Sequence, residues 1–245
     1  MIEELFDISF WQGNVDKEEM LAVARGLIIR LGSINKDTGA CYEDYLFREN
    51  NAKFDHEIPC GYYFYFRPKF SGLLQAQFVA NLLLELEIPL RLPMVIDVED
   101  NSTGLSQSKI QYEVLAFLQH LKSVGFTNLA IYTRGSFWNT NVGNPVWAKN
   151  YKLWVAMYSD TATHPWNGYP EYYHPESWDD YWMWQWSQTY DGKPLGCEGA
   201  LDANRCNVSE DEWDNYIGYF EEPSSFLCTI GNLLVELGTA LKEKC

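Results

Sequence analysis

Short apolar runs alternate with segments of helical periodicity through the first two thirds of the chain. A short apolar run bounded by polar or turn residues predicts a buried strand, and apolar residues spaced three and four apart predict a helix. Strands are expected at 5–9, 27–31, 60–66, 94–96, 128–133 and 152–158. Helices are expected at 16–26, 42–54, 71–87 and 108–125, the first capped by Asp16 and stopped by Gly26.

The pattern changes after residue 160. Residues 161–180 form an aromatic-rich loop region, and strand-like segments at 181–187 and 199–206 follow with no helix between them. Repeated alternation of strand and helix indicates a parallel sheet, and this many units favour closure into a barrel. The predicted fold is therefore α/β, an irregular (β/α) barrel of TIM-like type, with about five β/α units followed by helix-poor final strands.

A single catalytic domain is expected over residues 1–206, with a C-terminal helical extension, residues 207–245, packed on the barrel. Residues 226–242 carry apolar side chains at helical spacing, but Glu236 interrupts them, and the stretch is too short and too polar to span a bilayer. We expect a monomer, with oligomerisation through the terminal helix as the alternative.

Two acidic residues close the strand in "MVIDVED", residues 94–100. Successive side chains of a strand point to opposite faces, so Asp97 and Glu99 emerge together while Val98 and Asp100 face the other way. Two carboxyl groups that close in a partly desolvated site cannot both ionise freely. We therefore expect one of them to keep its proton near neutral pH, beside an ionised partner.

Two further acidic residues follow strands at the same predicted edge. Asp7 lies in the first strand and Asp202 in the last one. Because the active sites of parallel barrels lie at the carboxyl ends of the strands, all four acidic side chains should project at one mouth. A solvated loop carboxylate is the ordinary explanation for each acid alone, but their joint placement predicts a catalytic cluster.

Composition and charge narrow the class of ligand. Aromatic residues make up 16% of the chain, which suits packing on sugar rings as well as an aromatic core. The net charge of −16 removes the attraction that dominates binding to nucleic acids and anionic membranes, so neither is an expected partner. The four histidines and six cysteines show no metal-ligand spacing, so no metal or cofactor is expected.

The sequence resembles glycoside hydrolase family 25, the lysozymes of the bacterial muramidase type common in phage endolysins. "DISFWQGNVD", residues 7–16, is similar to the opening D-x-S-x-x-Q-G-x-x-D motif, and "MVIDVED" carries the D-x-E motif. The resemblance runs in order over about residues 5–206. Its other segments are "LIIRLG" (27–32), "CGYYFYFRP" (60–68), "AIYT" (130–133), "LWVAMY" (153–158), "MWQWS" (183–187) and "ALDANR" (200–205).

The resemblance implies hydrolysis of the β-1,4 bond between N-acetylmuramic acid and N-acetylglucosamine in peptidoglycan, with retention of configuration. It implies Glu99 as the general acid/base and Asp97 as its partner, with Asp7 and Asp202 completing the cluster. Whether Asp97 attacks the sugar or orients the N-acetyl group of the substrate stays open.

The resemblance also places aromatic residues along the substrate groove. The predicted sugar-binding residues are Tyr63, Tyr132, Tyr158 and Trp186. Trp154 and Trp184 fit the core equally well, and strand alternation puts Gln185 on the face opposite to Trp184 and Trp186. Many members of the family have G-x-Y-H-F where this chain has Phe64 in the histidine position, which could alter a subsite or a hydrogen bond to a catalytic carboxylate.

Two other function classes fit parts of the pattern. A catalytically inactive glycan-binding barrel would keep the aromatic residues, although the intact Asp97 and Glu99 favour an enzyme. A metal-dependent hydrolase or nuclease would use Asp97, Glu99 and Asp100 to hold Mg²⁺, but alternation turns Asp100 away.

The start of the sequence, "MIEELFDISF", has no basic segment ahead of its first apolar stretch and so predicts no signal peptide. We expect synthesis in a host cytoplasm, action on the bacterial cell wall after release, and free thiols rather than disulfides.

Overall fold

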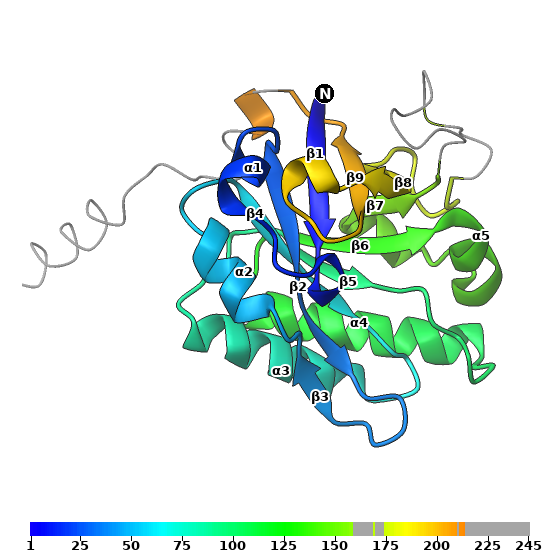
Figure 1. Ribbon diagram of the computed structural model, residues 1–245. Coiled ribbons are helices and arrows are strands. Elements are labelled where there is room, and N and C mark those ends of the chain that lie inside the picture. The colour runs from blue at the N-terminus through cyan, green and yellow to red at the C-terminus, as the bar shows by residue number, and fades with distance from the viewer. Residues whose placement is uncertain (159–168, 170–173, 210, 214–245) are drawn as a thin grey trace, which may run out of the picture.

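The computed structural model describes residues 1–158, 169, 174–209 and 211–213. Eight strands form a closed barrel (Figure 1). They are β1 (Ile2–Ile8), β2 (Gly26–Ile34), β4 (Cys60–Tyr65), β5 (Met94–Asp97), β6 (Leu129–Arg134), β7 (Lys152–Ala156), β8 (Met183–Asp191) and β9 (Ala200–Cys206). Neighbours from β1 to β8 run parallel, and β9 closes the ring as an antiparallel strand between β8 and β1.

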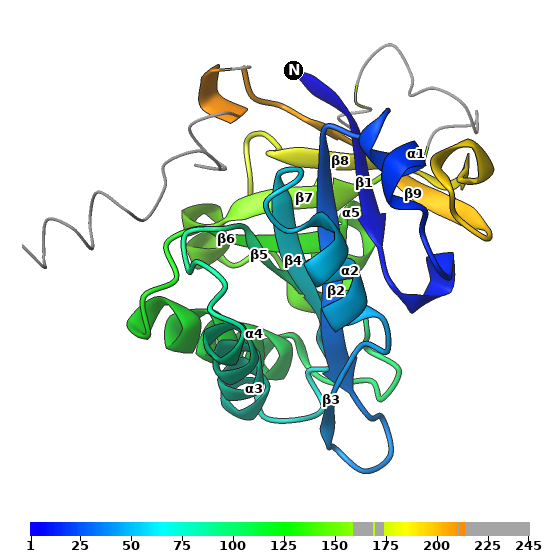
Figure 2. The same ribbon diagram turned by 60° about the vertical axis from the view of Figure 1, so that its left-hand side comes forward.

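Five helices follow the early strands, as the alternating pattern predicts. They are α1 (Lys17–Leu21), α2 (Phe47–Phe54), α3 (Gly72–Glu85), α4 (Gln107–Ser123) and α5 (Gly135–Phe137). The two long helices, α3 and α4, lie side by side on the outside of the barrel (Figures 1 and 2). No α-helix lies between β8 and β9, which a short 3₁₀ turn, Lys193–Leu195, connects. Two further 3₁₀ turns are Phe10–Gln12 and Val146–Asn150, and Trp138–Val142 is a π-helical turn.

Two expected helices are shorter than the sequence pattern suggests. Asp16 caps α1 as expected, with its side chain accepting a hydrogen bond of 3.0 Å from the backbone N–H of Glu19, but the helix ends at Leu21. Gly26 is not a helix stop, because it is the first residue of β2. The helix expected from residue 42 begins only at Phe47, because Cys41–Glu43 form β3, an antiparallel partner for the end of β2.

The barrel has two cores, separated by the alternation of its strands. On β4, Tyr62 and Phe64 face the surrounding helices, and the Phe64 ring stacks on Phe117 of α4 at 6.0 Å between ring centroids. Inside the barrel, a second cluster of apolar side chains fills the end at which the parallel strands begin. Members of this inner cluster include Leu5, Ile28, Val95 and Ala130.

The beginning of the C-terminal extension packs on the barrel. Trp213 is buried, and a Cβ atom added to Gly26 would lie 2.7 Å from its ring, so the ring covers the start of β2. The helix expected within residues 226–242 lies outside the described residues. No described helix has both the length and the apolar character needed to cross a membrane. Cys41, Cys60, Cys197 and Cys206 are free thiols.

Candidate active site

The interior of the barrel changes from apolar to polar over one step of two residues. Leu5 is followed by Asp7 on β1, Ile28 by Arg30 on β2, and Val95 by Asp97 on β5, each pair two residues apart and therefore on the same face. The apolar members seal the barrel interior below, and the polar members line a cavity of about 230 Å³ at the carboxyl ends of the strands. The fold thus places charged side chains directly next to the apolar interior of the barrel.

Asp97 and Glu99 share this cavity, as their spacing predicts. Val98 points outward into the core between strands and helices. Asp100 also turns away, where its carboxylate accepts a hydrogen bond of 2.9 Å from the guanidinium of Arg67. Asp97 is the deeper of the two acids, only 5% exposed, whereas the Glu99 side chain is 25% exposed at the mouth.

Burial raises the pKa of both members of this pair. Desolvation, followed by repulsion from Glu99, raises the pKa of Asp97 well above its usual range. Desolvation also raises the pKa of Glu99, while the Arg134 guanidinium, 3.8 Å from its carboxylate, acts in the opposite direction. The Oδ1 atom of Asp97 is buried and has no hydrogen-bond partner within the described structure. In the free protein, burial thus favours the protonated form of this pair, and the family resemblance alone points to Glu99 as the acid that carries the proton.

Asp7 and Asp202 form a second pair of carboxyl groups on neighbouring strands. They stand directly opposite each other in the antiparallel register of β1 and β9. Burial raises the pKa of Asp7 to about 6, against the opposing effect of hydrogen bonds from Asn204 and Gln185. Burial, and then the charge of Asp7, raise the pKa of Asp202 to about 9. Burial and mutual repulsion therefore favour one shared proton on this pair at neutral pH.

A chain of amide and hydroxyl groups fixes the orientation of Asp7. Gln185 and Asn204 each donate a hydrogen bond of 2.9 Å to its Oδ2 atom. The hydroxyl of Tyr132 donates to Oε1 of Gln185 at 2.8 Å, and the indole N–H of Trp154 donates to Oδ1 of Asn204 at 2.9 Å. Since hydrogen bonds from Tyr132 and Trp154 orient both amides, the amides in turn fix the orientation of the Asp7 carboxylate.

Three of the four residues predicted to bind sugar line the cavity: Tyr63, Tyr132 and Tyr158. Tyr158 lies beside Arg134, whose guanidinium donates to the tyrosine hydroxyl at 3.3 Å and covers its ring. Sugar contact by these tyrosines stays a prediction.

The expectation for Trp186 needs correction. Trp186 is 6% exposed and packs in the outer core against Tyr190, and it is not part of the cavity lining. Along β8, Trp184 and Trp186 face the outer core and Gln185 faces the cavity, so the amide occupies the site and the indoles do not. Alternation in the sequence already required this separation.

The suggested consequence of Phe64 is also corrected. Its side chain is fully buried against Phe78 and Phe117 of the helix layer, on the face of β4 opposite to Tyr63. A residue at this position cannot reach a subsite or a catalytic carboxylate, because the strand itself lies between them. The departure from the family motif therefore lies in the packing between the barrel and its helices.

Comparison with known proteins supports the motif resemblance. The sequence profile of the glycosyl hydrolases family 25 matches residues 6–193. The chain belongs to glycosyl hydrolase family 25. Its sequence is 29% identical over 213 residues to Lysozyme M1 of Streptomyces globisporus, an alignment that covers 83% of this chain and 67% of the relative.

Solved structures agree with family 25 membership at the level of the fold. The bacterial lysozyme from Streptomyces coelicolor superposes with a TM-score of 0.69 at 24% identity, over 87% of this chain and 96% of the other. A muramidase from Acremonium alcalophilum gives a TM-score of 0.66 at 20% identity, over 89% of this chain and 99% of the other. As a family 25 glycoside hydrolase, the protein is an enzyme with its acidic cluster at the carboxyl end of the barrel.

Sequence reasoning missed several residues that line the family 25 cavity. Arg30 and Arg134 place two positive charges among the four acids, and Trp11 projects at the rim with 71% of its surface exposed. Trp11 lies inside the opening motif, "DISFWQG", so its position four residues after Asp7 could have predicted that it lies near the site. Arg134 carried no such signal, because it reaches Glu99 only through the parallel pairing of β5 and β6. Among the described residues, no group of three or more acidic, histidine or cysteine side chains is arranged to hold a metal ion.

Proposed function

We propose that this enzyme is an N-acetylmuramidase that hydrolyses the β-1,4 bond between N-acetylmuramic acid and N-acetylglucosamine in peptidoglycan. The observation that carries the proposal is the pair Asp97 and Glu99 in one cavity, at different depths, in a family 25 barrel. The names of the relatives, a lysozyme and muramidases, support the choice of substrate.

In this mechanism Glu99 is the general acid. Its place at the mouth lets it reach a glycosidic oxygen, and burial raises its pKa, which favours the protonated form that a general acid needs. Asp97 lies beneath, with one carboxyl oxygen free of partners in the described structure, where it can stabilise the positive charge that develops at the anomeric carbon. Asp97 acts either as a nucleophile or through the substrate N-acetyl group, and both routes retain configuration.

Binding of substrate should redistribute the proton between the two acids. In the free protein Asp97 keeps its proton more strongly than its usual pKa predicts. A sugar amide or a positively charged anomeric centre beside Asp97 would favour its ionised form and reduce that shift. We propose that glycan binding completes the division of roles, with Asp97 ionised and Glu99 protonated.

The decisive experiment combines the Glu99→Gln variant with product analysis. Turnover of purified peptidoglycan should fall by about 10²- to 10⁴-fold, because glutamine cannot supply the proton, while binding to the glycan persists. Glu18→Gln, an exposed substitution on α1, serves as the control and should keep full activity. Mass spectrometry of wild-type digests should find new reducing ends on muramic acid. Reducing ends on glucosamine, or an active Glu99→Gln variant, would refute the proposal.

A further inference from the structure

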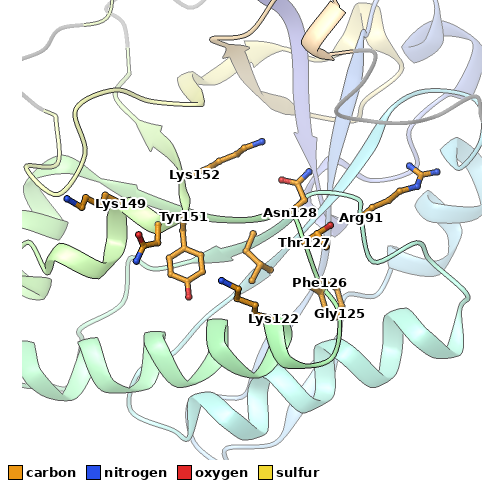
Figure 3. A pocket seen from close by; sticks show the side chains of 11 residues that line it. Arg91, Lys122, Gly125, Phe126, Thr127, Asn128, Lys149, Tyr151 and Lys152 are labelled. Atoms are coloured by element: carbon orange, nitrogen blue, oxygen red, sulfur yellow. The ribbon is translucent and has the colours of Figure 1, made fainter.

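A basic cleft opens at the end of the barrel opposite to the catalytic mouth. Arg91 precedes β5, Lys122 lies in the last turn of α4, and Lys149 and Lys152 flank the entry to β7. Figure 3 shows these side chains arriving from separate segments around one hollow. The cleft has a volume of about 800 Å³, and each of these segments leads into a strand that ends at the active site.

The basic cleft is positively charged, whereas the molecule as a whole is negatively charged. The chain carries 34 acidic residues against 18 lysines and arginines, yet the described residues that line the cleft include four of those cations and no Asp or Glu. Side chains that can form hydrogen bonds, including those of Thr127, Asn128 and Tyr151, complete the lining. Several cations around one concave surface concentrate positive potential, since the low-dielectric walls of a cleft focus the field.

Among the described residues, no ion pair involves Lys122 or Lys149. Lys122 stands where a cation stabilises a helix C-terminus, but backbone N–H groups of Val124, Gly125 and Phe126 already bond the last carbonyls of α4. Lys149 is exposed on a short turn. Lys152 is half-buried, with its ammonium group 5.5 Å from the centroid of the Trp182 ring, and burial lowers its pKa to about 8, so a bound anion would favour its charged form.

We propose that the basic cleft is a second ligand site, which binds the phosphate groups of an anionic wall polymer. Phosphate fits because lysine ammonium groups bind it as point charges and arginine binds it in a bidentate manner. The opposite placement of the two openings lets the barrel hold a phosphate polymer at one end while a glycan strand occupies the other. The choice of a wall polymer rests on the proposed function, whereas phosphate binding by the cleft does not.

Such a site would offset the unfavourable long-range field of the protein. A molecule with a net charge of −16 is repelled by an anionic wall. A local group of four cations gives a short-range attraction at one surface and leaves the catalytic mouth unobstructed. Binding there would also select walls by their phosphate polymers, which the acidic cavity cannot do.

The test measures binding in the full-length Glu99→Gln background, so that it does not depend on hydrolysis. The probes are inorganic phosphate, a soluble poly(glycerol phosphate), and neutral dextran as the blank. The cleft variant is Lys122→Gln with Lys149→Gln. The matched control is Lys36→Gln with Lys193→Gln, two exposed lysines outside the cleft, which gives the same net charge.

The wild-type cleft should bind the polymer more tightly than phosphate, with affinity falling as salt rises, and dextran should not bind. The cleft variant should bind the polymer at least tenfold more weakly and lower the slope of log affinity against log salt by about one to two, while the control pair should change neither. Equal losses in both pairs, or no binding of either probe, would overturn the site. Binding of phosphate alone would overturn the assignment to a wall polymer.

Discussion

At the residue scale, β1, β2 and β5 each place an apolar side chain inside the barrel and a polar one two residues further on. Val95 and Asp97 of β5 show the arrangement, since the first seals the barrel and the second reaches the cavity. The cost of burying these carboxyl groups appears as raised pKa values, for which desolvation is the largest cause at Asp7, Asp97, Glu99 and Asp202. Burial therefore opposes ionisation of these carboxyl groups in the free enzyme.

Asp202 gives a direct test of this effect of burial on ionisation. Its pKa is raised to about 9 in the folded protein, from a reference value of 3.8, so folding favours the protonated form. The stabilising contribution is complete below about pH 4 and is lost as pH rises towards 9. Asp202→Asn removes the titration and should therefore become more stable relative to wild type as pH rises, by on the order of 1–3 kcal/mol between pH 5 and pH 8.

Urea unfolding at the two pH values measures this difference. Asp37→Asn, a substitution in the exposed β2–β3 turn, is the control and should follow wild type at both pH values. A constant difference between Asp202→Asn and wild type across the range would contradict the burial argument. Loss of activity in Asp202→Asn is a separate readout and does not bear on it.

At the scale of elements, the contact between α3 and α4 depends on one glycine. Gly72, the first residue of α3, lies so close to α4 that an added Cβ atom would be 1.9 Å from the backbone oxygen of Glu113. The buried carboxylate of Glu113 accepts a hydrogen bond of 2.6 Å from the backbone N–H of Gly72 and pairs with Lys109. One helix start is thus anchored on the side of the next helix.

Replacement of this glycine should separate the two helices. We expect Gly72→Ala to lower the free energy of unfolding by about 2–4 kcal/mol, since a backbone atom cannot rotate away as a side chain could. Chemical denaturation at neutral pH measures the loss. Gly199→Ala is the matched control, because a Cβ atom there meets nothing within 4 Å and should change stability by less than about 0.5 kcal/mol. A Gly72→Ala protein as stable as wild type would show that the helices shift without cost.

The remaining strands need no covering helices between them. β8 and β9 form an antiparallel pair, and their outward side chains Trp184, Trp186 and Leu201 belong to the outer core. Large aromatic side chains on these strands, together with the short 3₁₀ turn, supply apolar cover that helices supply elsewhere. This explains how the barrel closes after its regular alternation of strand and helix has ended.

At the scale of the whole molecule, charge controls the approach to the substrate. Peptide stems of peptidoglycan carry carboxylates, and a protein with a net charge of −16 is repelled by them at long range. For peptidoglycan stripped of phosphate polymers, the KM should fall as ionic strength rises from about 10 to 150 mM, because the Debye length shortens from about 30 to 8 Å.

Turbidity assays at constant pH give this salt dependence. Peptidoglycan with amidated stem carboxylates is the control substrate and should show a smaller effect. A KM that rises with salt on the stripped wall would mean that attraction, and not repulsion, governs the encounter. Polymer binding by the basic cleft is expected to weaken with salt, so the two effects have opposite signs and can be separated.

Much of the fold was predictable because local patterns specify it. Asp16 predicts the start of α1, and apolar runs predict the strands. The loss of helical periodicity predicts that β8 and β9 close the barrel without a helix between them. The errors lie where tertiary pairing overrides a local signal: Cys41–Glu43 became a strand because β2 offers an edge, and Gly26 entered β2 under the ring of Trp213.

The sequence by itself determined the spacing of Asp97 and Glu99, their shared face, and the separation of Gln185 from the indoles beside it, because a strand alternates with a period of two. Only the tertiary structure decided the depths of the two acids, the pairing of Asp7 with Asp202, and the approach of Arg134 to Glu99. It also brought the lysines of the basic cleft together. Proton affinity depends on burial and on charges from distant strands, and these arise only when the barrel closes.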